Sequence, residues 1–470
     1  LLTAFIIVML LNIVLMLLPT VIKYDHTPEP VEGRDHPRET ESNISQNIPN
    51  PSNITTNNTD TNKNSQHSHN DTDFEKYSIP STLPPAPTVS IPEANNSGAD
   101  STPSSDDVSK DANTPEEHSD SVTLCLMGDL MCLAGQQYTA ERRDGTHDYT
   151  GSFHLVRDFF SSCDFVIGNL ETTLSESNPY STKEREVNEQ PNCNAPADYL
   201  ASLTWAGITH LVTANNHSLD GGLVGIEETV AHLDEYGIPH TGTYRSDYNG
   251  AHYMMLEKNG IRIAILSFTE LINQRTLLTA SQLARMIDSY SKKDIAKRIA
   301  QARADGADFV VVYAHWGSEN VHEVRDYQKA HAKEIAAAGA DLIIGSHPHC
   351  LQEMEYIVTE DGKSVPCFYS LGNVVSSMTR DINHDTVFVQ VSLRSNKEAN
   401  SVYNSVSITS LSLLPCHVLT ALDGHYRVIT PLDYKTGDKK ITEELARAKA
   451  RIEEIFAPHG NTPESESQRH

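Results

Sequence analysis

An α/β domain, with helices covering the faces of its sheets, is predicted for residues 121–470 by two observations. From Ser121 onward, short apolar runs typical of buried strands alternate with amphipathic stretches typical of helices. This βαβ alternation is characteristic of α/β domains. The second observation narrows the class of α/β domain. No Gly-x-Gly-x-x-Gly or Gly-x-x-x-x-Gly-Lys loop follows any strand, so a nucleotide-binding α/β fold is not favoured.

The apolar runs expected to form buried strands are, in order, Val122–Met127, Phe165–Ile167, His210–Thr213, Ile261–Ser267, Phe309–Tyr313 and Leu342–Ile344. The helices expected between them are Pro196–Ala206, Gly222–Tyr236, Ser291–Ala304 and Gln328–Ala338. After Asn373, three segments alternate like strands of a partly exposed sheet: Thr386–Leu393, Val402–Leu414 and His425–Thr430. Ile441–Phe456 has the pattern of a charged amphipathic helix that closes the domain.

Residues 1–22 are almost wholly apolar and uncharged, which predicts a transmembrane anchor or signal segment. A helix of this length spans roughly 33 Å, enough to cross a bilayer core. A retained anchor is favoured over a cleaved signal, because no small-x-small cleavage site ends the run and no cysteine that could accept a lipid comes directly after it.

Residues 23–120 are expected to form a disordered acidic spacer that holds the domain away from the membrane. Residues 24–120 carry 18 Asp/Glu against 5 Lys/Arg and are rich in Ser, Thr, Asn and Pro. Few apolar side chains are present to offset the entropy lost on ordering this backbone.

The charge balance of residues 121–470 argues against a nucleic-acid partner. These residues carry 45 acidic against 30 basic side chains, whereas phosphate backbones are bound by basic surfaces. An anionic ligand must therefore be met by local positive charge or by a metal. The seven cysteines form no Cys-x-x-Cys pair, which indicates buried thiols rather than a disulfide scaffold or a zinc finger.

Five polar clusters each directly follow an apolar run, and they make a metal-assisted hydrolase site the leading hypothesis. They are Gly128-Asp129, Gly168–Glu171, Ala214–His217, His315–Gly317 and His347–His349. In open α/β sheets ligands bind beyond the carboxyl ends of the strands, so we expect these clusters to converge. Mixed Asp, Glu, Asn and His donors suit Zn²⁺, Mn²⁺ or Fe²⁺ rather than Ca²⁺.

Each cluster also has an ordinary interpretation when it is taken alone. Gly128-Asp129 fits a turn, Asn169–Glu171 fits a helix N-cap, and His347 with His349 fits a surface pair. The common position and order of all five clusters favour the site.

These clusters, together with Ser370–Asn373, resemble the motif series of the bacterial capsule-synthesis CapA family over residues 122–376. That family includes the membrane-anchored subunit of poly-γ-glutamate synthesis complexes. It is similar to the calcineurin-like metallophosphoesterases, so the resemblance implies a four-layer αββα sandwich.

The resemblance also implies roles for individual residues. It places His217 as the acid that protonates a leaving oxygen, and Asp220 and Asn373 are expected to support the ligands. Three roles are open for Glu319: a substitute ligand, a partner that orients His315, or a member of a surface salt bridge. The expected ligands of one or two divalent transition-metal ions are Asp129, Glu171, Asn216, His315, His347 and His349.

Two departures from the phosphoesterase pattern bear on the metal. Met131 stands where those enzymes have the histidine of Asp-x-His, so one nitrogen ligand is missing. Glu171 replaces the usual bridging Asp and is longer by one methylene. A single or differently selective metal site is consistent with both changes, and phosphoester hydrolysis does not follow from the sequence.

Three functions remain open. The first is a capsule or poly-γ-glutamate biosynthesis protein, anchored in the cell membrane by a single pass with its domain outside, that meets other synthase subunits and binds or processes the polymer. The second is a cell-surface metal-dependent hydrolase of phosphoesters or amides, unrelated to a capsule. The third is a metal-free adhesion or scaffold domain, for which Asp129, His347 and His349 would be dispensable.

Overall fold

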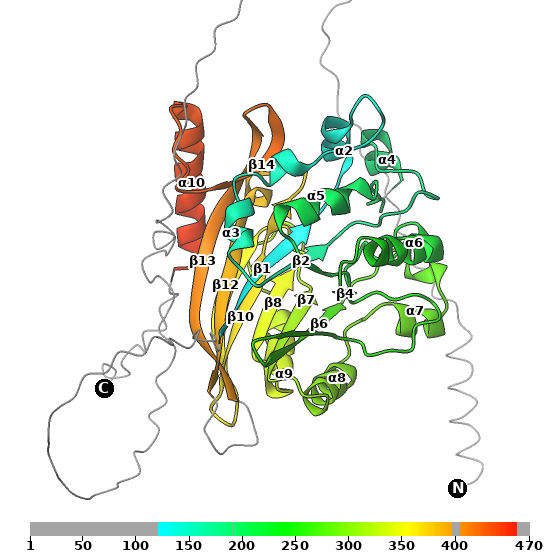
Figure 1. Ribbon diagram of the computed structural model, residues 1–470, viewed down its shortest axis with the longest axis vertical. Helices are drawn as coiled ribbons and strands as arrows, with labels where there is room; N and C mark the ends of the chain where they lie inside the picture. Colours follow the sequence, from blue (N-terminus) through cyan, green and yellow to red (C-terminus); the bar gives the residue numbers. More distant parts are fainter. Residues whose placement is uncertain (1–120, 190, 397–404, 458–470) are drawn as a thin grey trace, which may run out of the picture. The chain divides into compact units, whose positions relative to one another are not determined.

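The computed structural model describes residues 121–189, 191–396 and 405–457, which form two β-sheets with helices packed on both (Figure 1). The predicted anchor at residues 1–22 and the predicted spacer at residues 23–120 lie outside the described residues. Within the described ranges, no helix is long and apolar enough to cross a membrane.

The first sheet has eight strands and combines parallel and antiparallel pairing. Its order is β14-β13-β12-β1-β2-β3-β4, with β11 paired to the end of β1. β1 runs parallel to β2 and β11 and antiparallel to β12, so it is the strand at which the two patterns meet. The strands are β1 (Ser121–Leu130), β2 (Phe165–Leu170), β3 (His210–Val212), β4 (His240–Thr241), β11 (Asn373–Val375), β12 (Asp385–Asn396), β13 (Ser405–Leu422) and β14 (His425–Pro431).

The second sheet has six strands in the order β5-β6-β7-β8-β10-β9. Its four central strands are parallel, and the two edge strands, β5 and β9, are antiparallel to their neighbours. The strands are β5 (Met254–Lys258), β6 (Ile261–Thr269), β7 (Phe309–His315), β8 (Leu342–Ser346), β9 (Leu351–Val358) and β10 (Ser364–Leu371).

The inner faces of the two sheets pack against each other through a continuous apolar layer. Leu124 and Leu126 of β1 belong to the same buried cluster as Val311 of β7 and Ile344 of β8. Alternate residues of the same strands point the other way, because side chains along a strand alternate between its two faces. The buried runs therefore read as nearly continuous apolar sequence, as expected for strands covered on both faces.

Helices cover the outer face of each sheet. On the first sheet the cover comes mainly from α3 (Arg157–Ser161), α5 (Asp198–Ala206) and α6 (Gly222–Glu235). On the second it comes from α8 (Lys292–Ala304) and α9 (Asp326–Ala337). The result is a mixed α/β fold with helix, sheet, sheet and helix layers (Figure 1).

The predicted strands and helices are found close to where the sequence placed them. The strands that lead to the polar clusters extend further than predicted: β1 continues to Leu130 and β7 to His315. The alternating segments after Asn373 extend the first sheet through β12, β13 and β14. The predicted closing helix is α10 (Lys439–Ile455), whose Ile452 belongs to the cluster between the sheets. Four short helices, α2 (Ala134–Ala140), α3, α4 (Lys183–Asn188) and α7 (Ala280–Met286), were not predicted.

Candidate metal centre

Three neighbouring strands of the first sheet bring polar side chains to one row. In the pairing register, Asp129 of β1 lies opposite Asn169 of β2 on one side and opposite Asn373 of β11 on the other. Glu171 follows the last residue of β2, and Asn216 lies four residues beyond β3. Because β1, β2, β3 and β11 are parallel, all these side chains lie at the same edge of the sheet.

The second sheet supplies three histidines at its matching edge. His315 is the last residue of β7 and pairs in register with Ser346, the last residue of β8. His347 and His349 follow in the loop after β8. The main chain links the two sheets here, because the amide of His347 donates to Oδ2 of Asp129 at 3.1 Å.

The donors fall into two adjacent groups that share Glu171. Asp129, Glu171 and His349 form one group, and Glu171, His315 and His347 form the other; within each group the ligand atoms lie within 4.8 Å of one another. Asn216 joins the second group, since its Oδ1 lies 2.8 Å from Nε2 of His315. The same nitrogen lies 3.1 Å from Nδ1 of His347 and 3.5 Å from Oε1 of Glu171. All six predicted ligands therefore come together.

Glu171 is the most informative of these side chains. It is fully buried, and neither of its carboxylate oxygens has a hydrogen-bond partner. A buried carboxylate without partners is costly, so native proteins pair such groups or place them on a cation. Glu171 is also the residue common to both donor groups, which is the position of a bridging ligand.

Burial and neighbouring charges shift the pKa values of several of the candidate ligands. Burial lowers the pKa of His347 to about 3 and lowers that of His315 well below its usual range, so both rings are neutral near pH 7. Burial would raise the pKa of Asp129, but contact with His349 and the hydrogen bond from Asn169 hold it well below its ordinary value. Burial and the nearby charge of Asp129 raise the pKa of Glu171. The neutral rings of His315 and His347 are in the form that binds a metal, whereas Glu171 and His349, whose pKa values are raised, would have to release any bound proton when a cation enters.

The loop that carries His347 and His349 adopts a backbone conformation that residues other than glycine rarely take. His347 has φ +95° and His349 has φ +56°. Such conformations cost of order 1–3 kcal/mol each and concentrate at functional sites. Gly345, just before this loop, allows β8 to lie close to the backbone of β10. A Cβ at Gly345 would lie 1.9 Å from the carbonyl oxygen of Tyr369.

Several residues hold the donors in place. Nδ1 of His315 lies 2.9 Å from Oγ of Ser346, and Nδ2 of Asn169 donates to Oδ1 of Asp129 at 2.7 Å. Asn373, predicted to support the ligands, places its Oδ1 2.9 Å from Nδ1 of His349. Asp220, predicted for the same role, accepts from Nδ1 of His217 at 2.7 Å and so fixes the orientation of that ring.

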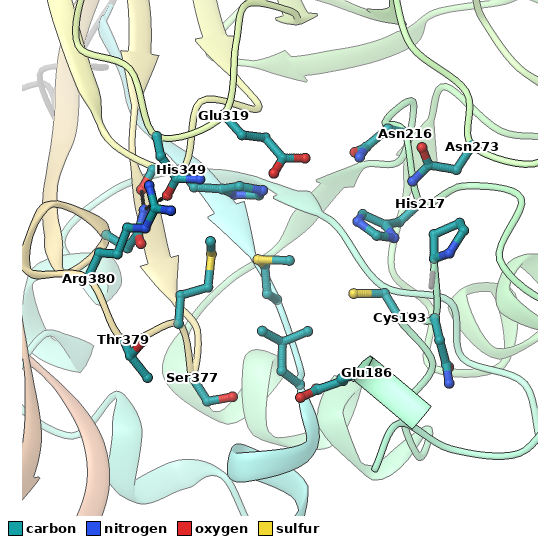
Figure 2. A pocket seen from close by; sticks show the side chains of 17 residues that line it. Glu186, Cys193, Asn216, His217, Asn273, Glu319, His349, Ser377, Thr379 and Arg380 are labelled. Carbon is teal, nitrogen blue, oxygen red and sulfur yellow. Dashed lines mark hydrogen bonds between the residues drawn. The ribbon is translucent and has the colours of Figure 1, made fainter. Parts of the chain in front are cut away.

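The donor groups open into a pocket of about 610 Å³, lined by Asn216, His217 and His349 among others (Figure 2). Glu319 lies at the rim of this pocket and is exposed. It belongs to neither donor group, and His315 is oriented by Ser346 rather than by Glu319. Met131, the residue that replaces a phosphoesterase histidine, also lines the pocket.

Sequence reasoning did not single out four residues that the structure places at or beside the site. Asn169 stands inside the cluster Gly168–Glu171 and Ser346 directly precedes His347, so their position was a usable signal. Arg380 and Cys193 line the pocket but belong to no motif, and only the fold brings them there.

Comparison with known proteins identifies the family. Residues 123–378 match the family described as "Bacterial capsule synthesis protein PGA_cap". The chain belongs to this bacterial capsule synthesis family. The matched range contains every residue of the two donor groups, so the candidate metal centre lies within the part of the chain that matches the family.

Two relatives of the capsule synthesis family have names that refer to the capsule or its polymer. "Capsule biosynthesis protein CapA" of Bacillus anthracis is 30% identical over 329 residues, covering 68% of this chain and 76% of the relative. "PGA biosynthesis protein CapA" of Bacillus subtilis (strain 168) is 28% identical over 289 residues, covering 61% and 72%. Among solved structures, the sulfate thiohydrolase SoxB of Thermus thermophilus has a TM-score of 0.37 at 12% identity, covering 73% of this chain and 62% of that chain.

Proposed function

We propose that this chain acts in the biosynthesis of a poly-γ-glutamate capsule, and that its domain binds one or two divalent transition-metal ions with which it processes the polymer. Membership of the capsule synthesis family and the printed names of the two Bacillus relatives support the biological role. One observation carries the metal: Glu171, shared by both donor groups, is fully buried and both its oxygens lack hydrogen-bond partners.

The donors fit a transition metal. Two carboxylates, one amide oxygen and three imidazoles make a mixed oxygen and nitrogen set, which suits Zn²⁺, Mn²⁺ or Fe²⁺ better than Ca²⁺. The helix, sheet, sheet, helix layering and the position of the donors at the strand ends support a domain of the metallophosphoesterase type. Because Met131 replaces a histidine, the group of Asp129, Glu171 and His349 has three candidate ligands. The other group has four, since Asn216 joins Glu171, His315 and His347.

The surrounding residues have separate tasks. A bound metal supplies the Lewis acidity that activates a water molecule and polarises the oxygen under attack. Asp220 accepts a hydrogen bond from Nδ1 of His217, which leaves Nε2 as the ring atom that can give a proton to a leaving group. Arg380 lines the other side of the pocket and has no ion-pair partner among the described residues, so it is placed to attract an anionic substrate (Figure 2).

The location of the domain is part of the same proposal. An apolar run at residues 1–22 supports a single-pass anchor in the cell membrane, and the acidic residues 23–120 support a spacer that holds the domain outside. The proposed partners are the growing polymer and the other subunits of the capsule synthase.

The proposal is tested by elemental analysis of the full-length protein and of its His347→Ala/His349→Ala variant. We expect one or two transition-metal ions per chain in the wild type and a loss in the variant. A matched control is His154→Ala/His425→Ala, a histidine pair with rings 5.4 Å apart that lies outside both donor groups and should keep the metal. The loaded protein is then assayed on γ-glutamyl oligomers and on phosphoesters.

The outcomes separate the candidate functions. Cleavage of γ-glutamyl oligomers that is lost with the metal supports polymer processing. Cleavage of phosphoesters alone would instead support a hydrolase unrelated to the capsule. A folded wild type that stays metal-free after reconstitution would overturn the proposed mechanism.

A further inference from the structure

A third group of possible metal ligands lies beside the two that share Glu171. Cys193, His217 and Asp220 each place one ligand atom within 4.8 Å of the other two. His217 and Asp220 come from the turn between β3 and α6, and Cys193 comes from the loop between α4 and α5. Figure 2 shows the sulfur of Cys193 and the ring of His217 on the same side of the pocket.

The backbone holds Cys193 firmly at this position. Its carbonyl accepts from the amide of Thr173 at 3.0 Å and from the hydroxyl of Thr173 at 2.8 Å. Its own amide donates to Oδ2 of Asp220 at 2.6 Å, which ties the loop directly to the carboxylate of the group. The side chain is almost fully buried, so the thiol faces the group rather than bulk solvent.

Asp220 provides an independent sign that a cation is required. Its side chain is almost fully buried, and Oδ2 already accepts from the Cys193 amide and from Nδ1 of His217. Oδ1 is buried and has no hydrogen-bond partner. An ionised carboxylate oxygen left in this state is unfavourable unless a positive charge lies against it.

The charges around Cys193 also favour a bound cation. Burial raises the pKa of its thiol well above the usual value, and the nearby carboxylates of Asp220, Glu171 and Glu186 raise it further. A neighbourhood of several carboxylates disfavours a bare thiolate but favours a divalent cation, which would neutralise the thiolate and the carboxylates together.

We propose that Cys193, His217 and Asp220 form a third cation site that selects a thiophilic divalent ion such as Zn²⁺ over Mn²⁺ or Mg²⁺. A thiolate, an imidazole and a carboxylate are zinc ligands, and thiolates discriminate against the harder ions. Three protein ligands leave a further coordination position, and Cys193 and His217 both line the pocket from which water reaches it. On binding, the cysteine thiol releases its proton to solvent.

Occupation of this site has a consequence for the chemistry next to it, and this consequence rests on the proposed function. His217 is both a ligand of the third ion and the proposed proton donor. An ion that holds the ring or displaces its hydrogen bond to Asp220 removes that donor. Excess zinc is therefore expected to inhibit the protein while the ions on Glu171 remain bound.

Cobalt is the probe that separates this site from the donor groups on Glu171. Co²⁺ bound to a thiolate has a strong charge-transfer band in the near ultraviolet, whereas Co²⁺ bound to oxygen and nitrogen donors shows only weak visible bands. We expect titration of the metal-free, full-length protein under anaerobic conditions to produce the charge-transfer band. The Cys193→Ser variant should lose this band and keep the visible bands.

A matched cysteine gives the control. Cys350 is also buried and adjoins the ligand His349, but it belongs to no donor group, so Cys350→Ser should keep the charge-transfer band. Asp220→Asn leaves the thiol in place and should shift the band to higher cobalt concentrations. This second variant carries the test if Cys193→Ser does not fold, as judged by far-ultraviolet circular dichroism.

Three results would overturn the third site. Visible cobalt bands without a charge-transfer band mean that only the centre on Glu171 binds metal, and the proposed function stands. A charge-transfer band that persists in Cys193→Ser means that another thiol binds the ion. Absence of both kinds of band would overturn the third site and the metal of the proposed function together.

Discussion

Glu171 shows how one side chain can be unfavourable for the metal-free fold and necessary for the site. Its carboxylate is buried without a hydrogen bond, next to the charge of Asp129. The gain from a cation must therefore be larger than the cost of keeping this group in the interior.

The variant Glu171→Gln tests this balance. It keeps the shape of the side chain but removes the charge, so the metal should be lost because the shared ligand becomes a weak one. In excess chelator, the variant should be at least as stable as the wild type, since no carboxyl group then has to be buried. Thermal unfolding with and without metal measures both effects. A variant that is less stable than the wild type in chelator would contradict the argument.

His210 lies outside both donor groups, and its burial should make the stability of the protein depend on pH. It begins β3, its Nδ1 lies 2.7 Å from Oγ1 of Thr209, and its ring meets that of Phe165 edge to face. Burial lowers its pKa from 6.5 to about 4. Between these two values the unfolded chain binds a proton that the folded protein does not, so stability is complete above pH 6.5 and falls as the pH decreases towards 4.

Comparison with His210→Gln isolates this contribution. The free energy of unfolding of the wild type should fall more steeply than that of the variant, by at most about 1.4 kcal/mol per pH unit. Chemical denaturation at a series of pH values in chelator measures the difference, and the metal ligands contribute equally to both proteins. Parallel pH profiles would show that the ring is solvated in the fold.

At the scale of elements, the end of β1 depends on contact between two backbones. A Cβ at Gly128 would lie 2.0 Å from the carbonyl oxygen of Gly372, directly before β11. The amide of Asp129 donates to that same oxygen at 3.1 Å. The glycine therefore allows the contact that places Asp129 beside Asn373.

Gly128→Ala should consequently destabilise the protein by several kcal/mol and displace Asp129. The added methyl group meets backbone atoms, which cannot rotate away as a side chain would. Gly437→Ala is the matched control, because a Cβ there meets no atom within 4 Å and should change stability by less than about 0.5 kcal/mol. Denaturant unfolding and metal content measure the two effects. Equal stability of the two variants would argue against close packing at this strand end.

The strands were predicted better than the positions at which they end. Apolar runs such as Phe309–Tyr313 gave the strands, but they predicted strand ends that were too early, because Gly128-Asp129 and Ala314-His315 continue the ladder despite their polar members. The convergence of the six candidate ligands was predictable, since each lies at or just beyond the carboxyl end of a buried strand. Cys193 and Arg380 were not predictable, because their place depends on how loops fold across the sheet edge.

At the scale of the whole molecule, a buried ion pair joins the C-terminal helix to the first sheet. Asp385 of β12 is fully buried and receives hydrogen bonds from Nε and Nη2 of Arg451 at 2.7 and 2.9 Å. Nδ1 of His417 lies 2.7 Å from the same carboxylate. The motif-free C-terminal region thus has a structural task, which is to fix α10 against the sheet.

Removal of Arg451 should be far more costly than removal of an exposed cation on the same helix. Arg451→Ala leaves the charge of Asp385 buried without its main partner, a loss of about 3–5 kcal/mol. Lys449→Ala is the control, because its ion pair with Glu453 is exposed and such pairs contribute about 0–1 kcal/mol. Equilibrium unfolding gives both values. Similar losses in the two variants would mean that Asp385 gains no stability from the pair.

The donors of the metal centre come from both sheets and from positions as distant in the chain as Asp129 and His349. Neither sheet holds a complete set, so a chain that is still being synthesised cannot complete either donor group before His347 has been added and the two sheets have met. Metal acquisition is therefore a late event in the life of the molecule. The proposed ion would therefore mark those copies in which both sheets have been synthesised and folded.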